Sequence, residues 1–83
     1  MRLVYFASIR EAIGCDSEER ATPPHVATIA QCLDWLGQED ARYAAAFSDR
    51  AKLRFAVDAE MAKPDAPLAS AQELAIFPPV TGG

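Results

Sequence analysis

Three segments of the chain have the hydrophobic pattern of β-strands. Residues 1–6 are apolar on both alternating faces, which is typical of a strand in the middle of a sheet. In residues 53–57, large apolar side chains alternate with Arg54 and Ala56, and this predicts a strand with one apolar face. Residues 74–77 are apolar throughout and predict the last strand. The first and last strands are therefore the most apolar.

A short helix is predicted directly after the first strand. Ser8 and Glu11 have the spacing of a capping box, in which each side chain accepts a hydrogen bond from a free backbone N–H at the helix start. Gly14 is expected to end this helix, because glycine readily takes the left-handed conformation that follows many helices. Residues 16–22 are too polar for a buried strand, so we expect an edge strand there if they pair at all.

The main helix is predicted in the centre of the chain. Thr28 and Gln31 have the spacing of a second capping box. Apolar residues at helical spacing then predict a stripe that faces the core. They are Ile29, Cys32, Leu33 and Leu36. Gly37 is expected to end this helix. Asp40 is a candidate N-cap for a third, alanine-rich helix that reaches about Phe47.

The order of these elements predicts an α+β fold. Two strands, a main helix and two further strands fit a mixed sheet of about four or five strands that packs on one main helix, with short extra helices. We expect the first and last strands to lie side by side and parallel in the middle of the sheet, because the helix lies in the crossover between them. This is the β-grasp, or ubiquitin-like, architecture, and we assign it to residues 1–77.

Residues 78–83 are predicted to form an extended, flexible tail. Pro78 and Pro79 end the last strand, because proline fixes φ and lacks an N–H group. The chain ends in two glycines without Cβ atoms, so another protein can approach their backbone closely. An extended tail of this length reaches about 20 Å. The sequence thus indicates a narrow extended segment, with the carboxylate of Gly83 at its end, that could enter a channel in another protein. The alternative is a frayed chain end or a remnant of cloning.

The composition excludes several functional classes. The chain has 83 residues, 51% of them hydrophobic, and a net charge of −4. Lysine and arginine form no cluster, which argues against binding to nucleic acid, and the negative charge fits a partner with a basic surface. No apolar run approaches the ~20 residues that cross a bilayer. The sequence begins without the pattern of a signal peptide, so we expect a cytoplasmic protein that does not bind membranes.

The thiols and the single histidine do not predict a metal site. Cys15, Cys32 and His25 cannot supply four ligands, and the two cysteines are not a CxxC pair. Cys32 lies on the apolar stripe and is interpreted as a core residue, whereas Cys15 follows a helix end and is a candidate exposed thiol. The sequence has no evident nucleophile–base pair or phosphate-binding glycine loop. We therefore expect no bound cofactor and no self-contained enzyme.

Phe77 is the strongest candidate for a contact with a partner. If the neighbours of Ala75 point into the core, the strand period of two places Ala75 and Phe77 on the opposite face of the sheet. An exposed phenylalanine at the root of a tail is typical of a protein interface, and the alternative is that it folds under its own loop. Trp35 is expected to pack against the segment of Tyr43 and Phe47, with a binding role as the alternative.

Two segments at opposite ends of the chain resemble one family. Residues 77–83, Phe-Pro-Pro-Val-Thr-Gly-Gly, are similar to the tail of the small subunits of molybdopterin synthase. Residues 4–14 resemble the first strand and first helix of the same ubiquitin-like sulfur carriers. The resemblance implies that Gly83 is adenylated, converted to a thiocarboxylate and donates sulfur to a cyclic pterin phosphate, in the biosynthesis of the molybdenum cofactor. Asp58 stands where members often carry Asn, and residues 38–52 contain no motif that can be aligned.

The resemblance also implies the partners. The small subunit would be a non-catalytic sulfur donor in a heterotetramer of two small and two large subunits, with the catalytic side chains on the large subunit. The residues that would thread into the large subunit are Pro78, Pro79, Val80, Thr81 and Gly82. A ubiquitin-activating-type enzyme would consume ATP to adenylate Gly83, and another protein would donate the sulfur. A sulfur carrier for thiamine or another pathway, a protein modifier joined to lysine through Gly83, and a plain binding module are the alternative functions.

Overall fold

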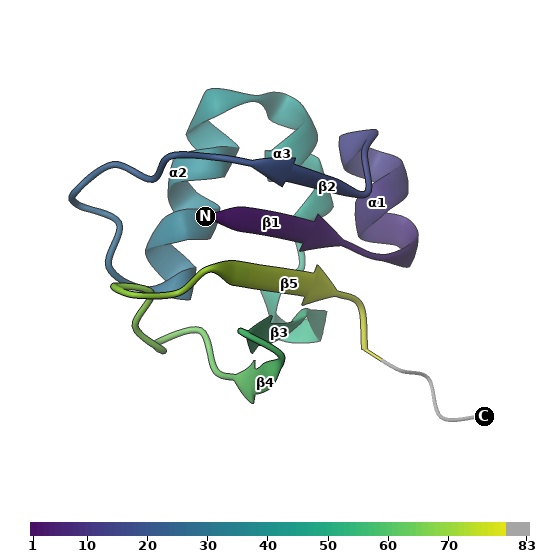
Figure 1. The fold of residues 1–83 in the computed structure, drawn as a ribbon. Coiled ribbons are helices and arrows are strands. Elements are labelled where there is room, and N and C mark those ends of the chain that lie inside the picture. Colours follow the sequence, from purple (N-terminus) through teal and green to yellow (C-terminus); the bar gives the residue numbers. More distant parts are fainter. Residues whose placement is uncertain (80–83) are drawn as a thin grey trace.

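Five strands form one mixed sheet in the computed structural model, which describes residues 1–79 (Figure 1). The strands are β1 (Arg2–Tyr5), β2 (Ser17–Glu19), β3 (Arg54–Val57), β4 (Glu60–Ala62) and β5 (Glu73–Phe77). Their order across the sheet is β2-β1-β5-β3-β4. β1 and β5 are parallel neighbours, and the other pairs are antiparallel. The predicted β-grasp arrangement, with the first and last strands side by side, is confirmed.

The helices cover one face of this sheet (Figure 1). They are α1 (Ala7–Ile13), α2 (Ile29–Glu39), α3 (Ala41–Ala46) and the 3-10 helix η1 (Arg50–Lys52). The main helix of the prediction is α2, and α3 packs against both α1 and α2. Among the described residues, no helix is long and apolar enough to cross a membrane.

The core lies between the sheet and the helices. The inward side chains of β1 and β5 are at most 1% exposed, and they are Leu3, Tyr5, Leu74 and Ile76. The predicted stripe of α2 packs on them, and all of its residues are buried: Ile29, Cys32, Leu33 and Leu36. Leu68 from the loop before β5 is also buried. The interpretation of Cys32 as a core residue is therefore confirmed.

Local signals predict the beginning of α2 correctly but not its end. The Thr28 hydroxyl accepts a hydrogen bond from the Gln31 N–H at 3.3 Å, and the Gln31 side chain accepts one from the Thr28 N–H at 3.1 Å. This confirms the capping box. The prediction that Gly37 ends the helix is wrong, because α2 continues to Glu39. A Cβ atom on Gly37 would lie 3.8 Å from the Ala44 Cα atom, so this glycine lies where α2 approaches α3.

Two other predicted caps are confirmed. Gly14 ends α1 with a φ of 95°, and its N–H donates to the carbonyl of Arg10 at 2.8 Å. Asp40 follows α2 and caps α3, because its Oδ1 atom accepts a hydrogen bond from the Arg42 N–H at 2.8 Å. That N–H, followed by the Arg42 guanidinium, lowers the pKa of the Asp40 carboxyl. Phe47 lies at the C-cap of α3, where the helix was expected to end.

The predicted capping box at the start of α1 is wrong. The helix begins at Ala7, and its N-cap is Phe6, whose side chain makes no capping hydrogen bond. Ser8 and Glu11 therefore lie within the helix. The chain passes into α1 directly from β1, because the Phe6 N–H still donates to the Ile76 carbonyl of β5 at 3.3 Å. This pairing across the sheet, which is not visible in the local sequence, determines where the helix starts.

The two edges of the sheet differ in how well the sequence predicts them. Within residues 16–22 the expected edge strand is present as β2, whereas β4 at the other edge was not predicted. The turn before β4 contains Asp58 and Ala59 with φ values of 48° and 70°, which are typical of a two-residue hairpin turn. The Asp58 Oδ1 atom accepts hydrogen bonds from the N–H groups of Gln72 at 3.0 Å and Glu73 at 2.9 Å. It therefore fixes this turn to the start of β5.

Candidate functional site

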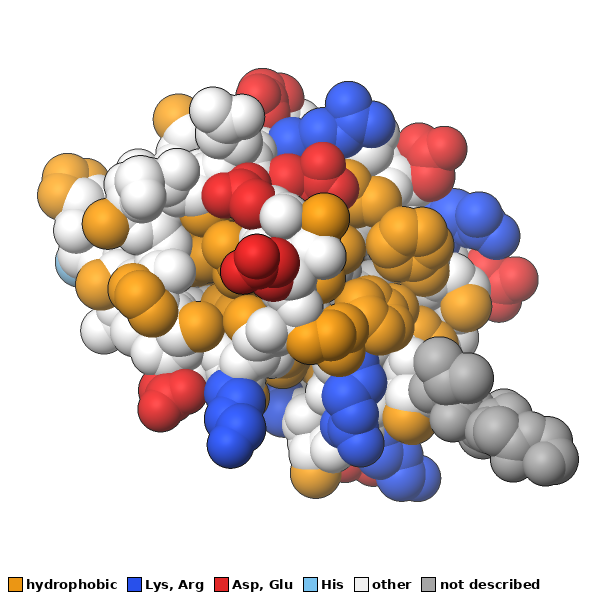
Figure 2. All heavy atoms as spheres, turned by 60° about the horizontal axis from the view of Figure 1, so that its bottom comes forward, with side chains coloured by type: hydrophobic (Ala, Val, Ile, Leu, Met, Phe, Trp, Pro, Cys, Tyr) orange, Lys and Arg blue, Asp and Glu red, His pale blue; other side chains and the backbone are white. Residues whose placement is uncertain are grey.

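A row of apolar side chains crosses the face of the sheet that the helices leave uncovered. Val4 of β1 pairs with Ala75 of β5, Ala75 pairs with Ala56 of β3, and Ala56 pairs with Met61 of β4. Because paired residues point to the same side of a sheet, these four side chains form one line over four strands. Figure 2 shows hydrophobic side chains gathered on this face.

Phe6 and Phe77 extend this row at the end of β5. Leu74 and Ile76 are fully buried, so the strand alternation places Phe77 on the outer face. The Phe77 ring is edge to face with the ring of Phe6, and their centroids are 6.1 Å apart. This aromatic contact joins β5 to the start of α1. We call the six residues of the row and the aromatic pair the apolar sheet surface: Val4, Phe6, Ala56, Met61, Ala75 and Phe77.

The exposed area of the apolar sheet surface comes mainly from two of its members. Met61 is 66% exposed and Phe6 is 45% exposed, and they are the exposed large hydrophobic residues of the described chain. Ala75 is only 9% exposed, because Val4 and Ala56 flank it in the centre of the sheet. Exposed large hydrophobic side chains that lie together mark interaction surfaces in soluble proteins. The apolar sheet surface is therefore the candidate site for a partner.

Sequence reasoning identified two members of this surface, Ala75 and Phe77, and missed the other four. Phe6 was treated as the end of a strand, and no role was predicted for Met61. The only sequence signal for Met61 is that it follows directly after the turn-like residues 58–60. These side chains lie close together only because the strand register pairs segments that are far apart in the chain, and the local sequence does not contain that register.

Pro78 and Pro79 follow β5 and are both partly buried. They lie directly after Phe77, so the chain leaves the sheet at the aromatic pair. The remaining predicted tail residues, Val80, Thr81, Gly82 and Gly83, lie outside the described part of the chain.

A polar cluster lies on the opposite side of β1, beneath the helices. The Glu18 carboxylate accepts hydrogen bonds from the hydroxyl groups of Tyr5 at 2.8 Å and Tyr43 at 2.6 Å. Arg20 donates to the Tyr43 hydroxyl at 3.2 Å, and its guanidinium lies 4.9 Å from the centroid of Trp35. Burial, followed by the hydrogen bond to Glu18, raises the pKa of both tyrosines. Each of these polar groups has a partner, so the cluster ties β2 to the helices and has the character of a structural element.

The thiols are not activated. Burial raises the pKa of Cys32 to about 11 and also raises the pKa of Cys15, so both are protonated near neutral pH. His25 is exposed in the loop before α2. Within residues 1–79, no three side chains of His, Cys, Asp or Glu lie together as a metal site requires.

The sequence matches the ThiS family over residues 3–83. It is 39% identical to the molybdopterin synthase sulfur carrier subunit of Escherichia coli (strain K12), with 100% of this chain and 99% of that protein covered. It is 30% identical to the molybdopterin synthase sulfur carrier subunit of Haemophilus influenzae, again with 100% and 99% of the two chains covered.

Solved structures share the fold. SAMP1 from Haloferax volcanii superposes with a TM-score of 0.73 at 27% identity, over 100% of this chain and 98% of that one. A putative molybdopterin converting factor, subunit 1, from Pyrococcus furiosus has a TM-score of 0.73 at 24% identity, over 95% of both chains. At that identity the second likeness supports the fold alone. The predicted ubiquitin-like architecture is thus confirmed by comparison as well as by topology.

Proposed function

This chain belongs to the ThiS family, and we propose that it is the sulfur carrier subunit of a molybdopterin synthase. The observation that carries the proposal is the 39% identity with such a subunit over the whole chain. The residues of the folded domain support it indirectly. Their thiols are not activated and they contain no group of metal ligands, so we place the reacting group at the C-terminal carboxylate of Gly83.

The Gly83 carboxylate needs activation, because hydroxide and oxide are poor leaving groups. In a ubiquitin-activating-type enzyme the carboxylate attacks the α-phosphate of ATP, pyrophosphate leaves, and an acyl adenylate forms. A sulfide equivalent, formally HS⁻ supplied by a sulfur-donating protein, then attacks the acyl carbon. AMP leaves with the bonding electron pair, and the product is a thiocarboxylate at Gly83. The acyl carbon is neither oxidised nor reduced.

The sulfur is then transferred within the synthase. The thiocarboxylate sulfur attacks a side-chain carbon of a cyclic pterin phosphate, and the carbon–oxygen bond at that carbon breaks, so that its oxygen leaves with the bonding electron pair. Water then adds to the acyl carbon. The bond between the acyl carbon and sulfur breaks, so sulfur remains on the pterin and Gly83 returns as a carboxylate. Two such transfers build a dithiolene that binds molybdenum. The large subunit supplies the catalytic side chains, and residues 78–82 of this chain reach its active site as a narrow tail.

The apolar sheet surface supports a docking role for the folded domain. Phe77 and Ala75 lie on it directly before the tail, and Met61 adds its most exposed side chain. A large subunit that covers this surface removes apolar area from water, which is the dominant favourable contribution to most protein association. The same contact would fix the point from which the tail extends. We therefore assign Phe77 and Ala75 to the interface with the large subunit.

Intact mass spectrometry tests this function. The chain is incubated with ATP, its activating enzyme and a sulfur donor, and the expected product carries one sulfur in place of one C-terminal oxygen. A matched variant with one residue added after Gly83 should remain unmodified. Transfer of the labelled sulfur to a pterin by the reconstituted synthase completes the test. An unchanged mass for the native chain under conditions that load a known sulfur carrier would refute the proposal.

A protein modifier is the second candidate, and one comparison favours it. The small archaeal modifier protein 1 of Haloferax volcanii has a TM-score of 0.72 at 26% identity over 96% of this chain. A modifier needs the same adenylation, but its acyl group is passed to a lysine amine. The mass experiment separates the two candidates, because a modifier yields an isopeptide-linked product with a target protein and a sulfur carrier yields a thiocarboxylate.

A further inference from the structure

An arginine lies beside the apolar sheet surface. Arg54 of β3 pairs with Phe77 of β5, and the next outward pair on the same two strands is Ala56 with Ala75. Arg54 is exposed and therefore lies on the outer face beside the root of the tail. Lys and Arg side chains border the hydrophobic surface along one edge in Figure 2. A protein that covers Phe77 must also cover or border this guanidinium.

The guanidinium of Arg54 is oriented by its own backbone. Its Nη1 atom donates hydrogen bonds to the carbonyl of Leu53 at 2.9 Å and to the carbonyl of Ala51 at 3.2 Å. An arginine has five N–H donors in a planar fork, so donors remain for a further partner. The side chain is thus partly fixed before any partner binds, which reduces the entropy lost on binding.

Arg54 differs from three arginines on the helical side of the molecule. Arg20, Arg42 and Arg50 each lie within 4.0 Å of a carboxylate, on Glu39, Asp40 and Asp34 respectively. Arg54 has no such ion pair within residues 1–79, and neither do Arg2 and Arg10; of these three, Arg54 is the one beside Phe77. Its charge is therefore compensated only by backbone carbonyls, and it lies on the surface proposed to lose water on docking.

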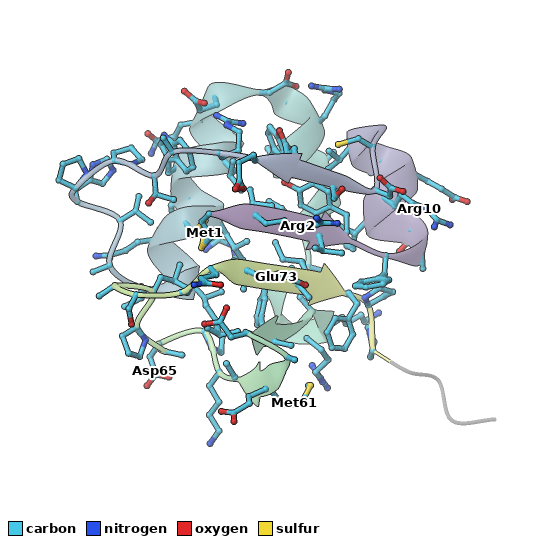
Figure 3. All side chains as sticks on the ribbon, in the orientation of Figure 1. Met1, Arg2, Arg10, Met61, Asp65 and Glu73 are labelled. Carbon is cyan, nitrogen blue, oxygen red and sulfur yellow. The ribbon has the colours of Figure 1, made fainter. Side chains whose placement is uncertain are left out.

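The opposite end of the same sheet face carries charges of both signs, because the Met1 ammonium also lies 4.0 Å from Glu19. Arg2 lies between Glu19 of β2 and Glu73 of β5 in the strand register, so this row has two carboxylates and one guanidinium. Figure 3 shows Arg2 and Glu73 next to each other on neighbouring strands. The apolar row therefore separates an end with compensated charges from the position of Arg54. A partner carboxylate placed over Arg54 favours the orientation in which the partner also covers Phe77, the last residue of β5.

From this arrangement we propose that Arg54 is a partner-recognition residue that binds a carboxylate on the protein covering the apolar sheet surface. The proposal rests on the proposed function, in which that protein is the synthase large subunit. A charge that is covered without a partner is strongly unfavourable, so a partner surface that lacks a carboxylate at this position is rejected. A protein carboxylate fits better than a free phosphate, because Phe77 and Ala56 beside Arg54 are apolar and are covered only by a protein that buries them together with the guanidinium.

The test is the affinity of variants for the large subunit of the same organism, measured by isothermal titration calorimetry. We expect Arg54→Glu to weaken binding by about thirtyfold or more, because two carboxylates would then face each other. Lys52→Glu is the matched control: it makes the same change in net charge on η1, where Lys52 is exposed and pairs with Asp49 at 3.7 Å. Its affinity should stay close to that of the native chain at moderate salt.

Two further variants separate a specific ion pair from other effects. Arg54→Met keeps an unbranched apolar stem and removes the charge, so binding should weaken because the partner carboxylate is left unpaired. Reversal of that carboxylate to arginine on the large subunit should restore binding to Arg54→Glu. Thermal unfolding of each variant shows whether the domain is intact.

The outcomes distinguish this inference from the function on which it rests. Equal affinities for Arg54→Glu and Lys52→Glu, with native binding intact, would overturn the role of Arg54 and leave the sulfur-carrier function standing. Tighter binding by Arg54→Met than by the native chain would do the same. If the native chain accepts sulfur but binds no large subunit, the synthase assignment and the role of Arg54 both fall.

Discussion

At the scale of single residues, two glycines have opposite roles. Gly14 has a φ of 95°, where side chains other than glycine are strained, whereas Gly37 lies within α2. A Cβ atom on Gly37 would make ordinary van der Waals contact with Ala44. We predict that Gly37→Ala stabilises the domain by about 0.5–1 kcal/mol, because alanine has the lower entropic cost in a helix. Urea denaturation measures the difference.

The matched control for this prediction is Gly14→Ala. It adds the same methyl group at a position with positive φ, so it should destabilise the domain by about 1 kcal/mol. Opposite signs for the two substitutions would support the assigned backbone conformations. A loss of stability in Gly37→Ala would show that α2 and α3 approach each other too closely for a methyl group.

The residue scale also explains which caps could be predicted. The bonds made by Thr28 and Asp40 involve groups within a few residues, so the sequence contains the whole signal. Ser8 has equally suitable spacing to Glu11, but pairing of Phe6 with β5 moves the helix start to Ala7. A cap motif is thus reliable only where no strand determines the boundary.

At the scale of elements, the apolar sheet surface depends on strand pairing. β1 and β5 are adjacent although nearly the whole chain lies between them, and β4 joins the surface only because the turn at Asp58 and Ala59 folds it back. The alternation of residues 74–77 predicted which side chains of β5 face outward. It could not predict that Phe6 and Met61 lie on the same face, because register is a property of the assembled sheet.

We predict that a charge introduced on the apolar sheet surface weakens binding to the large subunit. Met61→Asp places a charge at the most exposed apolar side chain of the sheet, and docking would remove that charge from water without a partner. We expect affinity for the large subunit to fall by about a hundredfold or more, because an uncompensated charge at an interface costs several kcal/mol. The melting temperature should change little, since Met61 is 66% exposed in the free chain. Calorimetric binding and thermal unfolding together measure both effects.

His25→Asp is the control for this prediction. It also introduces a carboxylate at an exposed position, in the loop before α2 and away from the sheet face, and should leave affinity unchanged. Phe77→Asp should weaken binding as well, but with some loss of stability, because it removes the contact with Phe6. Native affinity for Met61→Asp would exclude the sheet face as the docking site.

At the scale of the whole molecule, the proposed function divides between two parts of the chain. The described part of the chain has a closed core, hydrogen-bonded buried polar groups and thiols of raised pKa, and its outer sheet face is the surface proposed to dock. In the proposed function the reacting group is the carboxylate of Gly83, and the residues before it act only together with another protein. The single chain has the fold and the docking surface, whereas the proposed sulfur transfer takes place only in the complex with the large subunit.

This division predicts that Gly82→Ala separates stability from transfer. Gly82 has no functional group, so it contributes only a small volume and backbone freedom. In a narrow channel an added methyl group must displace a wall or shift the thiocarboxylate, and a displacement near 1 Å can lower the rate by about a hundredfold. The folded domain should be unaffected, because we expect residues 78–83 to extend from it as a tail. We therefore expect a native unfolding curve together with slow sulfur transfer.

The decisive measurement is single-turnover transfer from a chemically prepared thiocarboxylate, because this bypasses the activating enzyme and isolates the step in the large subunit. Gly82→Val should be slower than Gly82→Ala if the volume of the side chain is what matters. A matched change outside the tail, His25→Ala, controls for handling of the thiocarboxylate. Native rates of sulfur transfer for both Gly82 variants would mean that the thiocarboxylate of Gly83 reacts in open solvent. The narrow tail would then be unnecessary for transfer, and the docking surface alone would have to account for the specificity of the reaction.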